Sequence, residues 1–426
     1  MMKKLLKIFL VFFTFTSSFA GNVVVLTVNG AIDPPIADYT CGNIEKVNSS
    51  DTKLIVILLD TPGGLMSSTK KIANCIINSD VPVSVLVYPR GARAASAGVF
   101  ISMSSHIAAM SPGTHLGAAH PVSIGIGSDT SRTMKEKVTN DAIAWLRSLA
   151  QLRGRNADWA ERAVKFSESV TASEAESLKI IDLIASDVKD LIAKINHRQI
   201  AIDDTTVELE LDNANIIYAD MTIPQEFLHT ILNPNIAYLL LILGLVCIYL
   251  ELQHPGAILP GTLGVISLFS ALYAFQILPV NYIGILFIIA GIIMFILEIK
   301  TPTFGILTAG GIISMLLGSF MLTSSAPPGM RIDWWTIIPT VIFIALLFVF
   351  VIAKALLIQT KKVATGSEGL IGEIGEVIVE ISPGKVGKIS AHGEIWNAKS
   401  DEAIEKGEKI KIVAVDGMTV KVEKIK

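Results

Sequence analysis

Two short segments of this chain carry residue types that could do chemistry, and the first is a turn rich in glycine. The sequence from Asp60 to Gly64 reads DTPGG and directly follows an apolar, β-branched run. A Pro-Gly-Gly turn at the carboxyl end of a strand can present bare backbone N–H groups, and such groups can stabilise a developing oxyanion. Taken alone, the motif is more typical of a plain turn, so the hypothesis requires a nucleophile nearby.

The second segment offers that nucleophile. From Gly91 to Gly98 the sequence reads GARAASAG, which surrounds one hydroxyl, that of Ser96, with small residues. Small neighbours let a substrate backbone approach and let a strand turn sharply into a helix. A helix predicted for residues 97–104 would direct its N-terminal N–H groups at Ser96. The alternative is a serine that only caps a helix in a tight turn.

A serine nucleophile needs a base, and the chain offers two main candidates. Lys137 stands near the start of a predicted helix and could serve only if desolvation lowered its pKa. Helical periodicity does not select it, because Lys135 lies nearer the apolar stripe of that helix, and a solvated surface lysine is the ordinary interpretation of both. His120, which precedes a proline, is the second candidate base, whereas His106 and His115 are more typical of turns.

The elements that must position these residues alternate in type. Apolar, β-branched runs predict strands, and helical patterns lie between and after them. This alternation favours an α/β domain with a mostly parallel sheet covered on both faces. The predicted strands are 22–28, 54–59 and 83–88, with short strands within 196–211; the predicted helices are 35–48, 66–78, 97–104, 133–153 and 158–168.

Composition places the rest of the chain in a membrane. Of 426 residues, 51% are hydrophobic and only 17% are charged, which excludes a disordered protein and argues against a wholly soluble one. The net charge of −3 supplies no basic field for nucleic acid. Five apolar stretches each have about the length that a bilayer core requires. They are 236–252, 257–277, 282–299, 304–323 and 334–358.

The membrane region contains a repeat with an offset of 47 residues. The segment that begins at Glu251 matches the segment that begins at Glu298, and GVIS at 264–267 matches GIIS at 311–314. One helical hairpin is therefore used twice. Acidic residues inside a membrane are expensive, which would fit an ion or substrate path. Two interfacial acids at helix ends are the favoured interpretation.

The two ends of the chain have their own patterns. Residues 1–20 combine two lysines, an apolar run and small residues in the order of a secretory signal peptide, which predicts export of the domain that follows. Residues 365–426 contain short alternating runs separated by turns. They predict a small all-β barrel of four or five strands, similar to an OB fold.

Charge predicts the orientation in the membrane. If the first domain is exported, five spans place the barrel in the cytoplasm, where Lys354, Lys361 and Lys362 agree with the positive-inside rule. Four spans would place the barrel and these lysines outside. Cys41 and Cys75 both lie in the exported part and could pair, but each falls on a predicted helix face, so we expect two free thiols.

The combined motifs resemble a known family. DTPGG at 60–64, AASAG at 94–98 and MSPGTHLGAA at 110–119 together are similar to the long form of the NfeD family, membrane-bound serine proteases of the ClpP/crotonase class. The resemblance covers the whole chain. It implies a signal peptide at 1–20, a ClpP-like protease domain at 21–222, a linker at 223–235, a transmembrane bundle at 236–358 and an OB-fold domain at 365–426.

The resemblance also implies roles for individual residues. The family uses a Ser–Lys dyad, whose serine falls on Ser96 and whose lysine falls on Lys137. The oxyanion donors would be backbone N–H groups at Gly63 or Gly64 and at Ala97. Since His120 is reminiscent of the catalytic histidine of ClpP, a Ser–His arrangement stays open. No metal or cofactor is required by this chemistry.

Further expectations concern substrate, partner and location. The family is associated with stomatin-like (SPFH) membrane proteins, whose hydrophobic segments would be the substrate. We expect a homo-oligomer, a dimer or higher, in a bacterial-type inner membrane, with the protease domain extracytoplasmic and no nucleic-acid partner. The alternative is a non-proteolytic scaffold that organises a stomatin-type partner, with the protease-like domain as a binding module.

Overall fold

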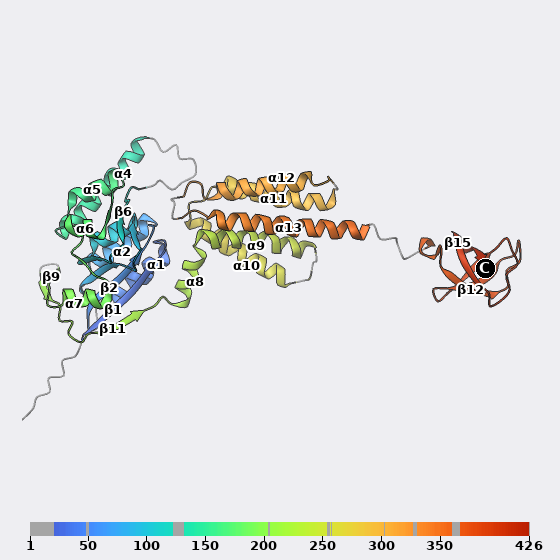
Figure 1. The fold of residues 1–426 in the computed structure, drawn as a ribbon, viewed down its shortest axis with the longest axis horizontal. Helices are drawn as coiled ribbons and strands as arrows, with labels where there is room; N and C mark the ends of the chain where they lie inside the picture. Colours follow the sequence, from blue (N-terminus) through green and yellow to red (C-terminus); the bar gives the residue numbers. More distant parts are fainter. Residues whose placement is uncertain are drawn as a thin grey trace, which may run out of the picture. The chain divides into compact units, whose positions relative to one another are not determined.

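The chain forms three structural parts in sequence order: an α/β domain, a bundle of apolar helices and a small β-barrel (Figure 1). The predicted fold class is therefore confirmed. The computed structural model describes residues 21–47, 51–121, 132–202, 205–253, 256, 258–301, 303–326, 330–359 and 367–425. The signal peptide predicted for residues 1–20 lies outside the described residues.

A six-stranded parallel sheet forms the centre of the α/β domain. Its strand order is β11-β1-β2-β3-β5-β8. The first three strands are almost continuous runs of Val, Ile and Leu, because a parallel sheet buries both of its faces. The bounds are β1 Asn22–Asn29, β2 Thr52–Asp60, β3 Val83–Val87, β5 Ile107–Met110, β8 Leu183–Ile184 and β11 Asn215–Ala219.

Helices cover both faces of this sheet, as the alternating pattern predicted. One hydrophobic core contains residues of the first six helices, and a second core on the other face contains residues of the seventh helix and of a β-hairpin. The helices are α1 Pro34–Val47, α2 Met66–Ile77, α3 Ala97–Ser104, α4 Arg132–Leu152, α5 Ala157–Lys165, α6 Ala172–Ser177 and α7 Val188–Ile195. The hairpin consists of β9 Gln199–Ile202 and β10 Thr205–Glu208.

A second, three-stranded sheet lies beside the first. Its order is β4-β6-β7, with β4 parallel to β6 and β6 antiparallel to β7. The strands are β4 Arg93–Ala95, β6 His115–Gly117 and β7 Ser169–Thr171. Because β4 ends directly before Ser96, this small sheet sets the position of the candidate nucleophile.

The prediction that Cys41 and Cys75 are free thiols is wrong. Cys41 on α1 and Cys75 on α2 form a disulfide, with their Cα atoms 5.6 Å apart. The two helices pack side by side on one face of the sheet. The surface of α1 that carries Cys41 therefore faces the surface of α2 that carries Cys75. Helical periodicity located each cysteine on a helix face but contained no information about which helix lies opposite.

Among the described residues, five apolar helices follow the α/β domain. Four of them, α9, α10, α11 and α13, are long and apolar enough to cross a membrane, whereas α12 has only 17 residues. Residues 223–235, predicted as a linker, contain the helix α8 (Ile223–Ile231), which packs against α1 and leads into α9. The bounds are α9 Pro234–Gln253, α10 Leu259–Ile277, α11 Tyr282–Lys300, α12 Ile306–Leu322 and α13 Trp334–Gln359.

Glycines at equivalent positions of the repeat allow close contact within each hairpin. A Cβ on Gly244 would lie 2.9 Å from the backbone nitrogen of Leu268 on α10. At the equivalent position 47 residues later, a Cβ on Gly291 would lie 2.9 Å from the carbonyl oxygen of Gly311 on α12. Small residues of this kind let membrane helices approach backbone to backbone.

The two acids of the repeat bind backbone N–H groups. The carboxylate of Glu251 accepts hydrogen bonds from the N–H groups of Gly256 and Gly261, each at 3.2 Å. The buried carboxylate of Glu298 accepts from the N–H groups of Gly305 at 2.9 Å and Thr308 at 3.0 Å. Each acid therefore closes the turn to the next helix and caps its first N–H groups, which favours the structural interpretation of both.

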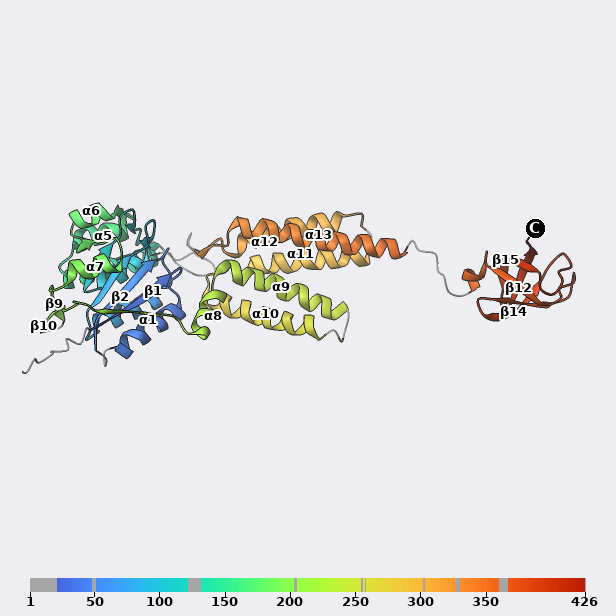
Figure 2. The same ribbon diagram turned by 60° about the horizontal axis from the view of Figure 1, so that its bottom comes forward.

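The C-terminal part is a closed five-stranded barrel (Figure 2). Its order is β12-β13-β14-β16-β15, and β14 pairs with β16 in parallel while all other pairs are antiparallel. The predicted barrel is confirmed, and β14 is a strand that the sequence pattern did not mark. The strands are β12 Ile374–Val379, β13 Gly387–Ala391, β14 Glu394–Lys399, β15 Lys409–Asp416 and β16 Thr419–Lys424.

Candidate active site

Ser96 occupies a strained position between a strand and a helix. It follows β4, caps α3, and has a backbone φ of 50° and ψ of −107°. Its N–H donates to the carbonyl of Gly117 at 3.0 Å, and its own carbonyl accepts from Val99 at 3.0 Å. A positive φ in a residue other than glycine costs on the order of 1–3 kcal/mol and is concentrated at functional sites.

The turn that begins at Asp60 is tied to the strand that ends in Ser96. Thr61 forms a β-bridge with Ala94: its N–H donates to the carbonyl of Arg93 at 2.8 Å, and its carbonyl accepts from Ala95 at 3.0 Å. As a result, a Cβ placed on Gly63 would lie 2.7 Å from the Cβ and 3.2 Å from the Oγ of Ser96. The structure therefore brings the glycine turn and the serine together, which the sequence motifs could not establish separately.

The backbone N–H groups of this turn differ in their availability. The N–H of Gly63 donates to the Oγ1 atom of Thr61 at 3.0 Å. Gly64 forms a bridge with Ile32 that uses the carbonyl of Gly63 and the N–H of Leu65, and within the described residues its own N–H has no acceptor. The N–H of Ala97, the first residue of α3, likewise has no acceptor among the described residues.

The other end of α3 is held by two arginines. The guanidinium of Arg155 donates to the carbonyls of Ser102 and Met103 at 2.9 and 3.0 Å, and Arg153 donates to the carbonyl of Ser104 at 3.0 Å. These are terminal carbonyls of α3 that have no partner inside the helix. Positive charge at a helix C-terminus is favourable, so the two arginines hold the helix that carries Ser96 at its other end.

A largely buried carboxylate, that of Asp182, supports this clamp; its side chain is 18% exposed. Asp182 accepts from Arg155 at 2.8 Å, from the N–H of Ala108 at 2.8 Å and from Arg198 at 3.0 Å. Burial opposes its ionisation, yet the two arginines and the N–H together hold the pKa of this carboxyl below its ordinary value. Asp182 is therefore ionised at neutral pH and fixes the orientation of Arg155.

The structure does not bring Lys137 into contact with Ser96 within the described residues. Lys137 is exposed in the second turn of α4. The later part of α4 packs on α3, where the rings of Trp145 and Phe100 stack with their centroids 4.5 Å apart. Lys137 lies eight residues before Trp145, or about 12 Å along the helix axis. The side chains from Thr133 to Val138 are all exposed.

His120 is likewise not in contact with Ser96 among the described residues. Its Nδ1 lies 2.9 Å from the carbonyl oxygen of Val164 on α5, so this nitrogen donates the hydrogen bond to that carbonyl. His106 is buried and accepts from the N–H of Val83 at 3.2 Å, and burial together with Arg153 and Arg155 lowers its pKa to about 3. His106 is thus a neutral structural residue, and His115 is exposed on β6.

Two residues of this site were given no role by the sequence analysis. Thr61 and Gly117 act through backbone and hydroxyl hydrogen bonds that depend on which strands become neighbours. Both residues stand inside quoted motifs, Thr61 in DTPGG and Gly117 in MSPGTHLGAA, but neither motif indicated this role. Within the described part of the chain, no group of three His, Cys, Asp or Glu residues has the geometry of a metal site.

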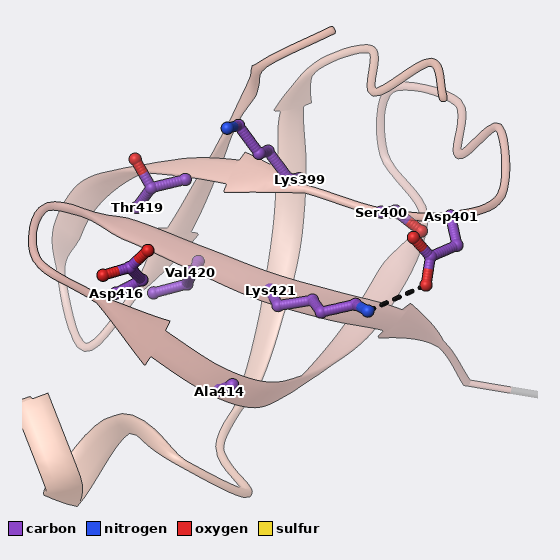
Figure 3. A pocket seen from close by; sticks show the side chains of 8 residues that line it. All are labelled: Lys399, Ser400, Asp401, Ala414, Asp416, Thr419, Val420 and Lys421. Carbon is purple, nitrogen blue, oxygen red and sulfur yellow. Dashed lines mark ion pairs between the residues drawn. The ribbon is translucent and has the colours of Figure 1, made fainter. Parts of the chain in front are cut away.

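The barrel has a groove of its own, with a volume of about 390 Å³ (Figure 3). Lys421 extends across it to pair with Asp401 at 2.8 Å. The residues that line the groove are Lys399, Ser400, Asp401, Ala414, Asp416, Thr419, Val420 and Lys421. None of them is aromatic and both charge signs occur, so the groove does not supply the stacking surface that single-stranded nucleic acid requires.

Fold and site together define a membrane protein whose α/β domain presents a strained serine beside a glycine turn. Three family models match in chain order: the NfeD1b N-terminal domain over residues 22–219, the NfeD integral membrane domain over 235–354, and the NfeD-like C-terminal, partner-binding domain over 367–424. A membrane-bound protease of Pyrococcus horikoshii, PH1510, is 35% identical, over 99% of this chain and 97% of the relative. The chain belongs to the long form of the NfeD family and is a multi-pass membrane protease.

Two further relatives match different lengths of this chain. The membrane protein NfeD1b of Bacillus subtilis is 25% identical over 95% of this chain and 93% of its own length. The 1510-N membrane protease of Pyrococcus horikoshii, described as specific for a stomatin homolog, is 32% identical over 50% of this chain and 98% of its own, with a TM-score of 0.44. Structures of 1510-N variants replace one serine and one lysine with alanine, and the lysine variant holds a substrate peptide.

Proposed function

We propose that this protein is a membrane-anchored serine endopeptidase with Ser96 as its nucleophile. The observation that carries the proposal is the approach of the Gly63–Gly64 turn to a serine held at positive φ. A nucleophile on a sharp turn from strand to helix projects its hydroxyl toward the substrate, and free N–H groups beside it stabilise the oxyanion. Of the candidate donors, Gly64 and Ala97 are preferred, because Gly63 already donates to Thr61.

Lys137 is the proposed base. In the relative, the replaced serine and lysine are 41 positions apart, and Ser96 and Lys137 have the same separation, which supports their pairing. An exposed lysine stays protonated, so the dyad requires that Lys137 be covered and desolvated. Met134 and Val138, both apolar and exposed, flank it on the same two turns and suit contact with a hydrophobic substrate or a second copy.

The reaction follows the usual course of acyl transfer. Neutral Lys137 takes the proton of the Ser96 hydroxyl as its Oγ forms a bond to the peptide carbonyl carbon. The N–H groups of Gly64 and Ala97 bind the oxyanion of the tetrahedral intermediate. Protonated Lys137 then gives its proton to the leaving amine as the peptide bond breaks, and water hydrolyses the acyl-enzyme with Lys137 again as base.

The substrate and partner are proposed from the relatives. The 1510-N protease is described as specific for a stomatin homolog, so we take hydrophobic segments of a stomatin-like (SPFH) membrane protein as the substrate class. The match of residues 367–424 to a partner-binding domain supports a role of the barrel in holding that protein. A homo-oligomer would supply the cover that Lys137 needs.

The proposed topology places the α/β domain outside the cytoplasm and the barrel inside. The disulfide between Cys41 and Cys75 supports an oxidising compartment for the first domain. An odd number of spans is then required, so α12 would cross as well, although 17 residues extend only about 26 Å. Its pairing with α11 repeats the pairing of α9 with α10, which supports a crossing. The domain boundaries proposed are 21–222, 236–358 and 365–426, with signal cleavage after residue 20.

Hydrolysis by the full-length protein in nanodiscs tests the function. We expect wild type to cleave members of a hydrophobic peptide panel, Ser96→Ala to be inactive, and Lys137→Ala to be slower by roughly 10²–10⁴-fold. Lys135→Ala is the matched control, since it removes another exposed lysine two positions earlier. Loss of activity in His120→Ala with an active Lys137→Ala would move the site to a Ser–His protease.

A second readout separates enzyme from scaffold. A fluorophosphonate probe should label Ser96 in wild type and not in Ser96→Ala. A folded wild type that neither cleaves the panel nor reacts with the probe, yet still binds a stomatin-like protein, would replace the protease proposal with the scaffold.

A further inference from the structure

A hydrogen bond joins the helix that precedes the first membrane span to the α/β domain. His229 on α8 places its Nδ1 2.6 Å from the Oδ2 of Asp33, a residue 196 positions earlier and only 5% exposed. The ring also lies against Gly30, where a Cβ would be 3.5 Å from Nε2. α8 leads into α9, the first apolar helix, after only two residues. His229 therefore connects the start of the membrane region to the loop between β1 and α1.

Asp33 is in turn fixed by its second oxygen. Its Oδ1 accepts from the N–H of Ile36 at 2.9 Å and so caps the first turn of α1. A buried carboxylate with both oxygens bound has little freedom to move. The backbone on either side of Asp33 therefore takes its position from α1 and from His229 together.

The residue before Asp33 supports the candidate oxyanion turn. Ile32 donates its N–H to the carbonyl of Gly63 at 3.0 Å and accepts from the N–H of Leu65 at 2.9 Å. These two bonds form the bridge between Ile32 and Gly64. A Cβ on Gly64 would lie 2.3 Å from the carbonyl oxygen of Ile32, so the two backbones are in direct contact. The path from His229 to the turn beside Ser96 contains only Asp33 and Ile32.

We propose that Asp33 and His229 are positioning residues, through which the juxtamembrane helix α8 holds the Gly63–Gly64 turn in the geometry that serves Ser96. The effect on catalysis rests on the proposed function. The contacts that connect His229 through Asp33 and Ile32 to the turn do not depend on it. Neither residue touches the reacting atoms. A partner or substrate that displaces α8 or the first span would act on the turn by the same path.

The charges around His229 favour a protonated ring. Asp33 raises the pKa of His229 by its hydrogen bond and its charge, burial opposes this, and the carbonyl of Asn29 accepts a further hydrogen bond from the ring. Asp33 is the charged group that faces the ring. Other charged groups of the neighbouring elements are engaged or distant. Glu226 is exposed on α8, and Asp38 of α1 pairs with Lys71. Asp60 at the end of β2 accepts from the backbone N–H of Arg93, and Glu251 stands at the far end of α9.

The pH dependence of the link follows from the direction of that shift. A pKa raised above the ordinary 6.5 means that the ion pair contributes fully below pH 6.5 and is lost as the pH rises through the folded-state value. The turn should therefore be held most firmly at mildly acidic pH, below the folded-state pKa of His229. Removing His229 should abolish this dependence.

Hydrogen exchange of the full-length protein in nanodiscs tests the link without relying on activity. The readout is exchange at the N–H groups of Ile32 and Leu65, which form the bridge to the turn. We expect His229→Ala and Asp33→Asn to speed exchange there roughly tenfold. Asn still caps α1 but carries no charge, so Asp33→Asn remains informative if His229→Ala fails to fold. Thr230→Ala, an exposed neighbour on α8, should change nothing.

The pH profile and the kinetics complete the test. After correction for intrinsic exchange, wild type should lose protection at Ile32 and Leu65 above the pKa of His229, whereas His229→Ala should show no such step. In His229→Ala and Asp33→Asn, the kcat of peptide hydrolysis should fall, with little change in KM. If exchange at both amides is unchanged in both variants, the proposal is overturned, whatever the activity does. If Ser96→Ala still cleaves peptides, the proposed function fails while the exchange data still decide the link.

Discussion

Gly63 and Ser96 approach each other so closely that no side chain can stand between them. A Cβ on Gly63 would meet the Cβ of Ser96 at 2.7 Å, and the φ of 115° at Gly63 is itself unsuited to any other residue. Close approach and backbone conformation thus both demand glycine at this point. The absence of a side chain leaves the Ser96 hydroxyl open on the side of the turn.

Substitution of Gly63 should therefore greatly lower activity while the domain stays folded. We expect Gly63→Ala to lower peptide hydrolysis by at least about 100-fold, because a shift of about 1 Å at the nucleophile has that effect. Gly113→Ala is the matched control: its φ is 82°, but a Cβ there meets nothing within 4 Å. It should cost about 1 kcal/mol in stability and leave activity within a few-fold. Equal activities of the two variants would contradict the assigned geometry.

The disulfide between Cys41 and Cys75 should stabilise the α/β domain substantially. It closes a loop of 34 residues, for which chain entropy predicts about 3–4 kcal/mol. Cys41→Ser/Cys75→Ser should therefore unfold more readily, and wild type should show the same loss after reduction. The measurement is protease resistance of the full chain with and without reductant. Cys247→Ser removes the buried free cysteine of α9 and is the control. Alkylation of two thiols in unreduced native protein from its own membrane would exclude the bond.

Arg155 should be among the most sensitive positions of the domain. Arg155→Ala removes the main partner of the largely buried Asp182 and the hydrogen bond to the carbonyl of Met103. The carbonyls of Ser102 and Ser104 keep Ser105 and Arg153 as partners. The expected loss is about 3–5 kcal/mol of unfolding free energy, measured from the slowest-exchanging amides of β1 to β3. Arg198→Ala removes a more exposed partner of Asp182 and should cost less than about 1 kcal/mol. A loss of the same size in both variants would mean that Asp182 does not depend on Arg155.

The cluster of Asp182, Arg155 and Arg198 predicts that the domain loses stability at acidic pH. The pKa of Asp182 lies below its ordinary value of 3.8 in the folded state. Its contribution is therefore complete above pH 3.8 and is lost as the pH falls through the folded-state value. In Arg155→Ala the loss should begin at higher pH, since the positive charge that lowers the pKa is gone. Denaturation curves of Asp182→Asn, measured over the same pH range, should lack this loss of stability.

Glu298 and Glu251 should act on stability rather than on transport. Glu298→Gln keeps only one acceptor oxygen, so its amide NH2 group faces the N–H group of either Gly305 or Thr308, and we expect a loss of about 1–3 kcal/mol in detergent. Glu251→Gln should cost less, because its hydrogen bonds are 3.2 Å long and its side chain is more exposed. Thermal unfolding measures both. Ion flux in liposomes that is lost in Glu298→Gln at unchanged stability would restore the ion-path hypothesis.

Local patterns alone determined much of this protein. The β-branched runs of β1 to β3, the helices that follow them, the apolar spans and the repeat at an offset of 47 residues are all properties of short segments. The glycine turn and the small-residue segment around Ser96 could be found for the same reason: each motif reflects backbone demands within a few residues. The strand β14 was not marked, because its sequence EIWNAK lacks a β-branched run, and its pairing with β13 and β16 forms it.

Tertiary structure decided how these segments meet. Periodicity placed Cys41 and Cys75 on helix faces but could not say that the two faces are adjacent. Likewise, only the bridge between Thr61 and Ala94 sets the turn beside Ser96, and only the packing of α8 on α1 brings His229 to Asp33 across 196 positions. The physical reason is that a residue's local conformation depends on its neighbours in sequence, whereas a contact between distant segments depends on the burial of whole faces at once.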